Sequence, residues 1–271
     1  MVQAAVVLLF GGRSSEHSIS SATAGGVLRA IDRERYRVIP VGITREGAYV
    51  LEDDDPDKFA LNADRLPEVV DNGTRIVWPE STVERELSVR RPDGTVESLG
   101  DIDVVFPILH GRFGEDGTVQ GFLELLDLPY VGAGLLMSAI GMDKHTTKSI
   151  LQAAGVPVVP WVTVTRAGLE RDGDLWRRRI RGLGLPVFVK PARAGSSVGV
   201  SKVSDWDELD AALETAFAED ASVLVEQAVT GREIECGVLQ GRDGGDPRVS
   251  VAGEIVVSGR DFYDFEAKYL G

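Results

Sequence analysis

The start of the chain alternates strand, loop, helix and strand, and this order constrains the fold more than any other feature. Residues 4–10 are a short apolar run typical of a buried strand. The glycine-rich loop 11–18 leads into a predicted helix at 19–31 and a second apolar strand at 36–43. Strands joined through a helix run parallel with a right-handed crossover. The sequence therefore predicts an α/β protein with an N-terminal parallel sheet.

The same apolar run must be weighed against a secretory signal peptide. No positively charged region precedes it and no small-residue cleavage site follows it, so a buried strand is the better interpretation. No other apolar run approaches the roughly 20 residues that span a bilayer. The single cysteine, Cys236, excludes an internal disulfide and a zinc site built from several cysteines. We therefore expect a cytoplasmic protein with no membrane partner.

The charge balance narrows the classes of partner. The 271 residues carry a net charge of −14, which argues against binding nucleic acid through bulk electrostatics. Binding of ATP remains open, because a phosphate site needs only a few local cations and backbone N–H groups. The length and the apolar content of 43% suit a folded protein of about two domains.

The rest of the chain alternates further strands and helices. Residues 45–100 are less regular, and residues 103–109 return to a buried strand that ends at His110. Further on, the patterns predict helices at 143–154, 169–183 and 206–218 and strands at 162–165, 186–190, 198–203 and 222–227. They also predict adjacent antiparallel strands within 232–240 and 248–258.

A phosphate-binding loop is the first candidate site, at Lys190 to Lys202 (KPARAGSSVGVSK). Lys190 ends a strand and supplies a positive charge, glycines let the backbone approach an anion, and Ser196 and Ser197 offer donors. The loop leads into a strand, unlike a Walker A sequence, so it would cover phosphates as a hairpin does. An ordinary β-hairpin is the alternative.

A second candidate is the loop HGRFGEDGTVQG, residues 110–121. His110 follows a buried strand, where α/β sheets place ligands, and it could polarise a carboxylate or donate to an oxyanion. Glu115 and Asp116 suit the N-terminus of a helix that starts near Val119. We interpret the acidic pair as structural and His110 as functional.

Single charged residues complete the candidate set. Glu16 lies in the loop 11–18, near the start of the predicted helix, and could hold a substrate ammonium group or cap the helix. Lys144 opposes the dipole in the first turn of its helix, which a nearby phosphate would explain, although an exposed lysine is the alternative. Glu226 and Glu233 could accept hydrogen bonds from adenine and ribose, or lie on the surface.

These stretches, in this order, resemble the D-alanine–D-alanine ligases of the ATP-grasp superfamily. The resemblance runs from Val6 to Tyr269 and is carried by GGRSSEHSIS, HGRFGEDGTVQG, MDKHTTK, FVKPARAGSSVGVSKV, EQAVTGREIE and DFYDFEAKY. It implies an ATP-grasp fold: an N-terminal, Rossmann-like parallel-sheet domain at 1–132, a central α+β subdomain at 133–226 and an incomplete C-terminal α+β subdomain at 227–271.

The resemblance also implies a reaction, in which ATP and two D-alanine molecules give D-alanyl-D-alanine, ADP and phosphate for cell-wall synthesis. A carboxylate of one D-alanine attacks the γ-phosphate, and the amine of the other attacks the resulting acyl phosphate. Phosphoryl transfer of this kind depends on positioning and charge neutralisation. Homodimers are usual in this family, so we expect one here.

Roles follow from the resemblance, motif by motif. Glu16 would bind the ammonium group of the first D-alanine, with Ser196 and Tyr269 linked to it by hydrogen bonds, and His110 would lie near that substrate's carboxylate. The nucleotide set comprises Lys144, Lys190, Ser196, Ser197, Glu226, Glu233 and Lys268, with Lys268 reaching the γ-phosphate.

Tyr269 favours the dipeptide-forming type of ligase over the type that makes D-alanyl-D-lactate. The family's Mg²⁺ (or Mn²⁺) ligands come later than any residue here, so we expect no metal ligand within the chain and the metal site beyond Gly271. We therefore read the chain as a truncated ligase and expect no turnover by its 271 residues. The alternatives are a D-lactate-type ligase and an inactive nucleotide-binding fragment.

Overall fold

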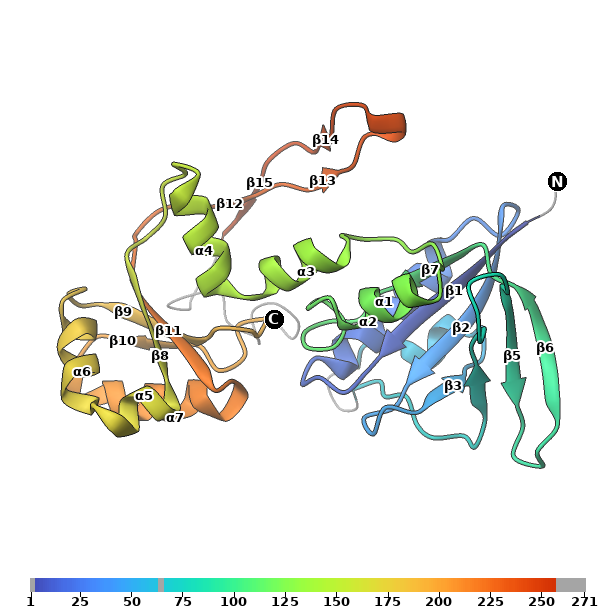
Figure 1. Ribbon diagram of the computed structural model, residues 1–271, viewed down its shortest axis with the longest axis horizontal. Coiled ribbons are helices and arrows are strands. Elements are labelled where there is room, and N and C mark those ends of the chain that lie inside the picture. The colour runs from blue at the N-terminus through green and yellow to red at the C-terminus, as the bar shows by residue number, and fades with distance from the viewer. Residues whose placement is uncertain (1–2, 63–65, 257–271) are drawn as a thin grey trace. The chain divides into compact units, whose positions relative to one another are not determined.

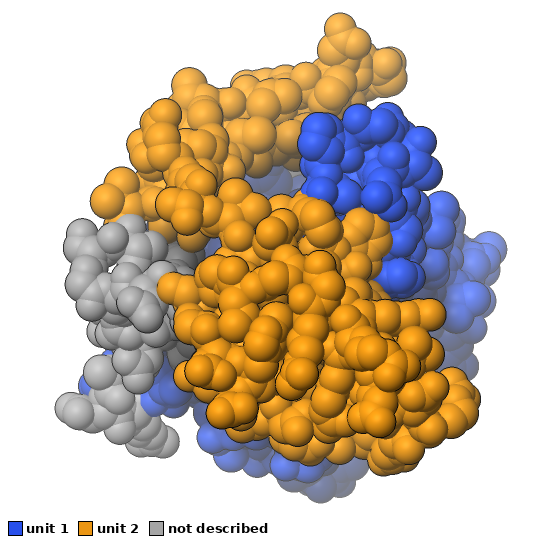
Figure 2. Space-filling model, turned by 90° about the vertical axis from the view of Figure 1, so that its left-hand side faces the viewer, with its two compact units in different colours: residues 1–158, 192–195 blue, residues 159–191, 196–271 orange. Residues whose placement is uncertain are grey.

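The computed structural model describes residues 3–62 and 66–256 (Figure 1). The chain divides into two compact units, coloured separately in Figure 2. Unit 1 comprises Met1–Val158 with Ala192–Gly195, and unit 2 comprises Val159–Pro191 with Ser196–Gly271. The loop 192–200 therefore contributes residues to both units.

A four-stranded sheet in the order β3-β2-β1-β7 is the centre of unit 1. β1 (Ala4–Gly11) pairs in parallel with β2 (Tyr36–Ile43) and with β7 (Val104–Pro107). The predicted parallel sheet is thus confirmed. A short edge strand, β3 (Tyr49–Leu51), adds antiparallel to β2 and was not expected from the sequence.

The two faces of β1 pack against different elements. Leu8 and Phe10 pack in a buried cluster with residues of α1 (His17–Ala30), the helix that follows β1. Val7 and Leu9 belong to a second cluster with residues of α2 (Thr118–Leu125), the helix that follows β7. The chain therefore leaves β1 toward one face and β7 toward the other. Ligands of α/β proteins bind at such switch points, outside the carboxyl ends of the strands.

A three-stranded antiparallel sheet, β4 (Arg75–Val77), β5 (Glu86–Arg90) and β6 (Val96–Asp101), fills the stretch that looked irregular in sequence. Leu87 and Val89 of β5 are fully buried in the cluster that contains Val7. The 3-10 helix η1 (Pro56–Phe59) precedes this sheet and buries Phe59 against Phe10, with ring centroids 4.8 Å apart.

Two helices follow one another at the end of unit 1. α3 (Leu135–Met142) was not predicted, whereas α4 (Lys144–Ala153) matches the predicted helix. Asp143 separates them: its backbone is extended, and its carboxylate accepts a hydrogen bond from the Thr146 N–H at 2.8 Å. This is a typical N-cap, so Asp143 ends one helix and starts the next.

Unit 2 is built on a second four-stranded sheet, in the order β10-β9-β11-β8. Its strands match the predicted ones closely: β8 (Trp161–Thr165), β9 (Val187–Pro191), β10 (Ser201–Val203) and β11 (Ser222–Gln227). All neighbours are antiparallel. The 3-10 helix η2 (Trp206–Glu208) leads into α7 (Leu209–Glu219), which buries Leu213 and Ala216 against the sheet.

The single helix predicted at 169–183 is wrong, because the segment forms α5 (Arg166–Arg171) and α6 (Gly173–Arg181). Asp172 lies between them with a non-helical backbone, and its side chain accepts a hydrogen bond from the Leu175 N–H at 3.0 Å. Aspartate competes for backbone N–H groups and favours such caps, which interrupts the helical pattern.

The remaining described segments of unit 2 form two short antiparallel pairs, as expected. β12 (Glu233–Glu235) pairs with β15 (Gly253–Ile255), and β13 (Val238–Leu239) pairs with β14 (Arg248–Val249), with the 3-10 helix η3 (Arg242–Gly244) between them. Among the described residues, no helix is both long and apolar enough to cross a membrane.

Candidate functional site

The loop after β7 holds its shape through hydrogen bonds of its own side chains. The Glu115 carboxylate accepts from the Gly111 N–H at 2.6 Å, and Asp116 accepts from the N–H groups of Phe113 and Thr118 at 2.9 and 3.1 Å. The Gln120 amide donates to the Gly114 carbonyl at 2.9 Å. The structural interpretation of the acidic pair therefore fits these contacts.

Glu16 lies at the start of α1 and is only 3% exposed. Its side chain makes no capping hydrogen bond to the helix, so the capping alternative does not describe it. A Cβ at Gly111 would lie 2.6 Å from its Oε2 atom, and a Cβ at Gly195 would lie 3.1 Å from the same atom. Two positions without side chains thus make room for one buried carboxylate at the carboxyl end of the sheet.

Two serines that the sequence did not single out tie the loops together. Ser14 Oγ donates to the His110 carbonyl at 2.7 Å and accepts from the Glu16 N–H at 3.2 Å. Ser20 Oγ donates to the Ile108 carbonyl at 2.7 Å and accepts from the Gly11 N–H at 2.9 Å. Both lie in the serine-rich SSEHSIS stretch, which was the available signal.

His110 is half-buried at the carboxyl end of the sheet. Its Nε2 atom is 3.4 Å from Thr23 Oγ1 of α1, and its carbonyl is held by Ser14. The loops after β1 and β7 thus bring His110 and Glu16 into one cluster, which the sequence predicted only through the family resemblance.

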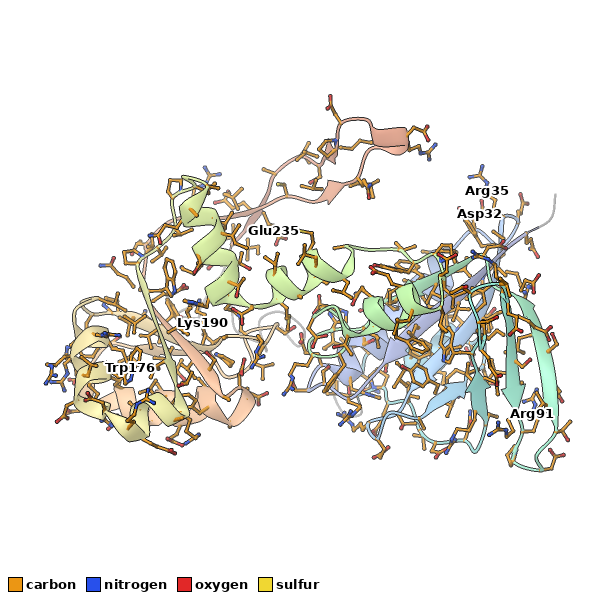
Figure 3. The ribbon with its side chains drawn as sticks, viewed as in Figure 1. Asp32, Arg35, Arg91, Trp176, Lys190 and Glu235 are labelled. Carbon is orange, nitrogen blue, oxygen red and sulfur yellow. The ribbon has the colours of Figure 1, made fainter. Side chains whose placement is uncertain are left out.

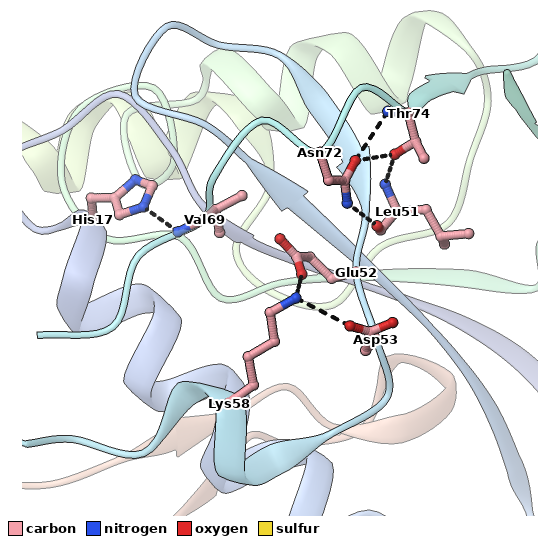
Figure 4. A network of polar contacts seen from close by, with 8 residues as sticks. All are labelled: His17, Leu51, Glu52, Asp53, Lys58, Val69, Asn72 and Thr74. Carbon is pink, nitrogen blue, oxygen red and sulfur yellow. Dashed lines mark hydrogen bonds and ion pairs between the residues drawn. The ribbon is translucent and has the colours of Figure 1, made fainter. Parts of the chain in front are cut away.

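His17 is a further residue that sequence reasoning missed. It is fully buried, its Nδ1–H donates to the Gly12 carbonyl at 2.6 Å, and its Nε2 accepts from the Val69 N–H at 2.9 Å. Figure 4 shows the bond to Val69 and, on neighbouring segments, the ion pairs of Lys58 with Glu52 and Asp53. Burial lowers the pKa of His17, so its imidazole is held in the neutral form.

Lys144 binds the segment of loop 192–200 that belongs to unit 1. Its Nζ donates to the Ala194 carbonyl at 2.6 Å, and its backbone N–H donates to the Ala192 carbonyl at 3.0 Å. Hydrogen bonds to backbone carbonyls thus explain why a lysine can occupy the first turn of this helix. Its predicted contact with phosphate stays a prediction.

Lys190 and Glu226 lie on the neighbouring strands β9 and β11 of unit 2 and form an ion pair with each other (Figure 3 labels Lys190). Their side chains are 19% and 17% exposed, so the pair is largely shielded from water. Ser196 and Ser197 adopt left-handed backbone angles, with φ of 49° and 58°. Glu233 begins β12 and is exposed.

Lys268 and Tyr269 lie outside the described residues. Among the residues that are described, no group of three or more His, Cys, Asp or Glu side chains is arranged to hold a metal ion. The described residues therefore contain no candidate metal site of this kind.

The fold is shared with solved ligase structures. The VanG D-Ala:D-Ser ligase from Enterococcus faecalis is 33% identical, with a TM-score of 0.77 over 97% of this chain and 72% of that chain. The D-alanine-D-alanine ligase from Coxiella burnetii is 35% identical, with a TM-score of 0.75 over 94% and 71%. The chain thus has the α/β fold of ATP-grasp ligases.

Sequence comparison defines the family. Residues 5–133 match the family described as D-ala D-ala ligase N-terminus, and residues 150–271 match D-ala D-ala ligase C-terminus. The D-alanine–D-alanine ligase of Paenarthrobacter aurescens is 50% identical over 267 residues, covering 98% of this chain and 71% of the relative. That of Streptomyces coelicolor is 48% identical over 274 residues, covering 98% and 70%. The chain belongs to the D-alanine–D-alanine ligase family.

Proposed function

We propose that the chain carries out the ATP-dependent ligation of two D-alanine molecules for the synthesis of peptidoglycan precursors. The observation that carries this proposal is the buried carboxylate of Glu16 at the carboxyl end of the parallel sheet. Gly111 and Gly195 pack close to this carboxylate, where any side chain would crowd it. A carboxylate so placed suits the ammonium group of a small amino acid, because opposite charges attract more strongly where water is partly excluded.

His110 is the proposed neighbour of the first substrate's carboxylate. Ser14 binds both the His110 carbonyl and the Glu16 N–H, so it sets the spacing between the two binding groups. This spacing orients the substrate carboxylate for attack on the γ-phosphate, which forms an acyl phosphate and releases ADP. The amine of the second D-alanine then attacks the carbonyl carbon, and inorganic phosphate leaves.

Lys144, Lys190 and the loop that contains Ser196 and Ser197 would bind the phosphates of the nucleotide. Left-handed backbone at two consecutive non-glycine residues is strained, and such strain clusters at ligand-binding loops. Glu226 and Glu233 would hold adenine and ribose, and Lys268 and Tyr269 would complete the site. The Lys190–Glu226 ion pair would rearrange when the lysine binds phosphate.

The domain division and the metal requirement are also proposals. We propose three domains, at 1–132, 133–226 and 227–271, and a cytoplasmic location. We also propose that the reaction uses a divalent cation, Mg²⁺ or Mn²⁺, whose ligands lie outside the described residues. Such a cation would neutralise charge on the phosphates.

Binding of D-alanine tests the site without requiring turnover. Calorimetry should detect D-alanine binding to the chain, with L-alanine binding more weakly. Glu16→Gln should weaken D-alanine binding about tenfold or more, because a charged hydrogen bond is lost. Glu97→Gln, an exposed residue of β6 that pairs with Arg91, is the control and should bind as wild type. Equal binding by Glu16→Gln would contradict the assigned role.

A chimera tests the reaction itself. The chain would be joined to the part of the Paenarthrobacter aurescens ligase that its match leaves uncovered. With ATP and Mg²⁺, the chimera should form D-alanyl-D-alanine, detected by mass spectrometry. Offering D-alanine and D-lactate together at neutral pH separates the proposal from the D-lactate alternative. Depsipeptide as the main product would overturn the dipeptide proposal. A folded chimera that binds ATP but forms no product would favour the inactive alternative.

A homodimer is the proposed assembly. Exposed apolar side chains gather along α2, α3 and the segment between them: Leu125, Val131, Leu136 and Met137, which are 80%, 45%, 66% and 60% exposed. Exposed apolar side chains on successive segments are typical of interfaces when they gather on one face. Light scattering should give a dimer for the chain and a monomer for Leu136→Asp, whereas a monomeric wild type would contradict the proposal.

A further inference from the structure

A cavity of about 310 Å³ lies beside the loops after β1 and β7, entirely within unit 1. Its lining includes Gly12 and His110 but not Glu16, so it lies against the proposed substrate site without containing its carboxylate. The volume is at the lower end of small-molecule pockets, about 300–1,000 Å³. The sequence motifs account for the loops beside this cavity, and among its lining residues only His110 has a role assigned from them.

The wall of the cavity carries two arginines held on one aromatic ring. The guanidinium carbons of Arg13 and Arg112 lie 4.8 and 5.2 Å from the ring centroid of Phe113. Neither arginine forms a salt bridge within the part of the chain that the structure describes, and both side chains are exposed. Stacking on a ring orients a guanidinium while leaving its N–H donors available to a ligand.

The backbone holds this arrangement at an energetic cost. Phe113 has a φ of 68°, a left-handed value that is rare for a bulky residue, and its N–H is fixed by Asp116 at 2.9 Å. Gly47 also has a positive φ, and a Cβ there would lie 3.1 Å from the Arg13 side chain. A strained residue such as Phe113 is typical of ligand-binding sites.

Aromatic side chains and one carboxylate line the rest of the cavity. Tyr49 and Phe122 contribute aromatic surface, and Trp78 packs edge-on against both rings, with centroids 5.9 and 5.3 Å away, which fixes this wall. Glu46 is the only carboxylate among the residues lining the cavity. Two cations against one carboxylate leave a net positive lining beside an apolar wall, which suits a small amphiphilic anion.

We propose that this cavity is a binding site for a small organic carboxylate with an apolar body, separate from the site of Glu16. The carboxylate accepts hydrogen bonds from Arg13 and Arg112, and the apolar body lies against Tyr49 and Phe122. The proposal does not rest on the ligase reaction, because binding here needs neither ATP nor D-alanine.

The probe for this site is 3-phenylpropionate, measured by ligand-observed NMR on the full chain. Saturable binding is expected for the carboxylate, and binding at least about tenfold weaker for the neutral 3-phenylpropanamide, because the charge-assisted hydrogen bonds are lost. Excess D-alanine should not displace the probe. No saturable binding, equal binding of the amide, or displacement by D-alanine would each overturn the proposal.

Variants locate the binding. Arg13→Gln and Arg112→Gln should each weaken binding of 3-phenylpropionate about tenfold or more. Arg91→Gln, a surface arginine of the same unit labelled in Figure 3, is the matched control and should bind as wild type. Circular dichroism checks that each variant is folded, and the comparison with the amide stands even if one is not. Unchanged binding by both folded variants would overturn the site.

Discussion

Single side chains of helix α1 and of the loops after β1 and β7 act mainly by binding backbone atoms. Ser14, Ser20 and His17 each connect two segments that are distant in sequence. Glu115 and Asp116 instead bind within their own loop. The charged groups proposed to meet ligands are thus positioned by neutral and acidic residues that need not touch a ligand themselves.

The buried His17 predicts a pH dependence of stability. Burial lowers the pKa of His17 in the folded state below its usual value of 6.5. Below pH 6.5 the imidazole therefore binds a proton more readily in the unfolded chain than in the folded one. The free energy of unfolding should be unaffected by His17 above that pH and should fall by up to about 1.4 kcal/mol per unit below it. Urea unfolding between pH 7.5 and 5 measures this slope.

His17→Gln is the matched control for that slope. A glutamine amide can donate to the Gly12 carbonyl and accept from the Val69 N–H, but it does not titrate. The variant should therefore fold and lack the histidine part of the pH dependence. An unchanged slope in this variant would assign the effect to other groups.

The close contact between Gly111 and Glu16 predicts that a side chain at position 111 lowers both stability and D-alanine binding. Gly111→Ala should strain a backbone with φ of 72° and press a methyl group against the Glu16 carboxylate. Gly94→Ala is the control, because φ is 89° there and nothing lies within 4 Å of the added Cβ. We expect about 1 kcal/mol of destabilisation for Gly94→Ala and a larger loss for Gly111→Ala, with weaker D-alanine binding in Gly111→Ala alone. Urea unfolding and calorimetry test both, and equal effects would contradict the crowding at Glu16.

At the scale of elements, the β4-β5-β6 sheet shows why short strands are hard to predict. β5 alternates exposed and buried positions over only five residues, and turn-forming residues flank it. Its assignment depends on the tertiary contacts of Leu87 and Val89 with the main sheet. Local sequence carries little of that information.

Burial of β5 predicts a contrast between two valines of the same region. Val89→Ala, at a fully buried position, should destabilise the protein by about 2 kcal/mol through lost transfer energy and the cavity left behind. Val83→Ala, at a position 90% exposed, should change stability by less than about 0.5 kcal/mol. Chemical denaturation of both variants is the measurement, and similar losses would contradict the packing of β5.

The break between α5 and α6 predicts a capping effect. Asp172→Ala should destabilise the protein by about 1 kcal/mol, because the Leu175 N–H loses its side-chain acceptor. Asp174→Ala, in the first turn of the same helix, removes only an interaction with the helix dipole and should have a smaller effect. Thermal unfolding ranks the two, and the reverse ranking would argue for one continuous helix.

For the whole molecule, the two units have separate cores. The clusters around Val7 and around Leu8 lie within unit 1, and the cluster around Leu213 lies within unit 2. Multidomain chains commonly depart from two-state unfolding, because each core can open by itself. A core mutation should therefore act mainly on its own unit.

Hydrogen exchange tests this independence. Val89→Ala should speed exchange in β1, β2 and β5 of unit 1 and leave β9 and β11 of unit 2 near the wild-type rate. Leu213→Ala should do the opposite, since Leu213 is fully buried in the second core. Peptide-resolved mass spectrometry reads both, and loss of protection across both units in either variant would show a single cooperative fold.

The sequence by itself determined the family, the parallel start of the main sheet, the strands of unit 2 and the candidate residues Glu16 and His110. These rest on periodicity and on motifs that are each continuous in the sequence, so local order is enough to find them. Only the tertiary structure decided that Gly111 and Gly195 border the Glu16 carboxylate, that Lys190 pairs with Glu226, and that Arg13 and Arg112 stack on Phe113. Each of these contacts except that of Arg112 joins residues far apart in the chain, and packing sets the geometry of them all.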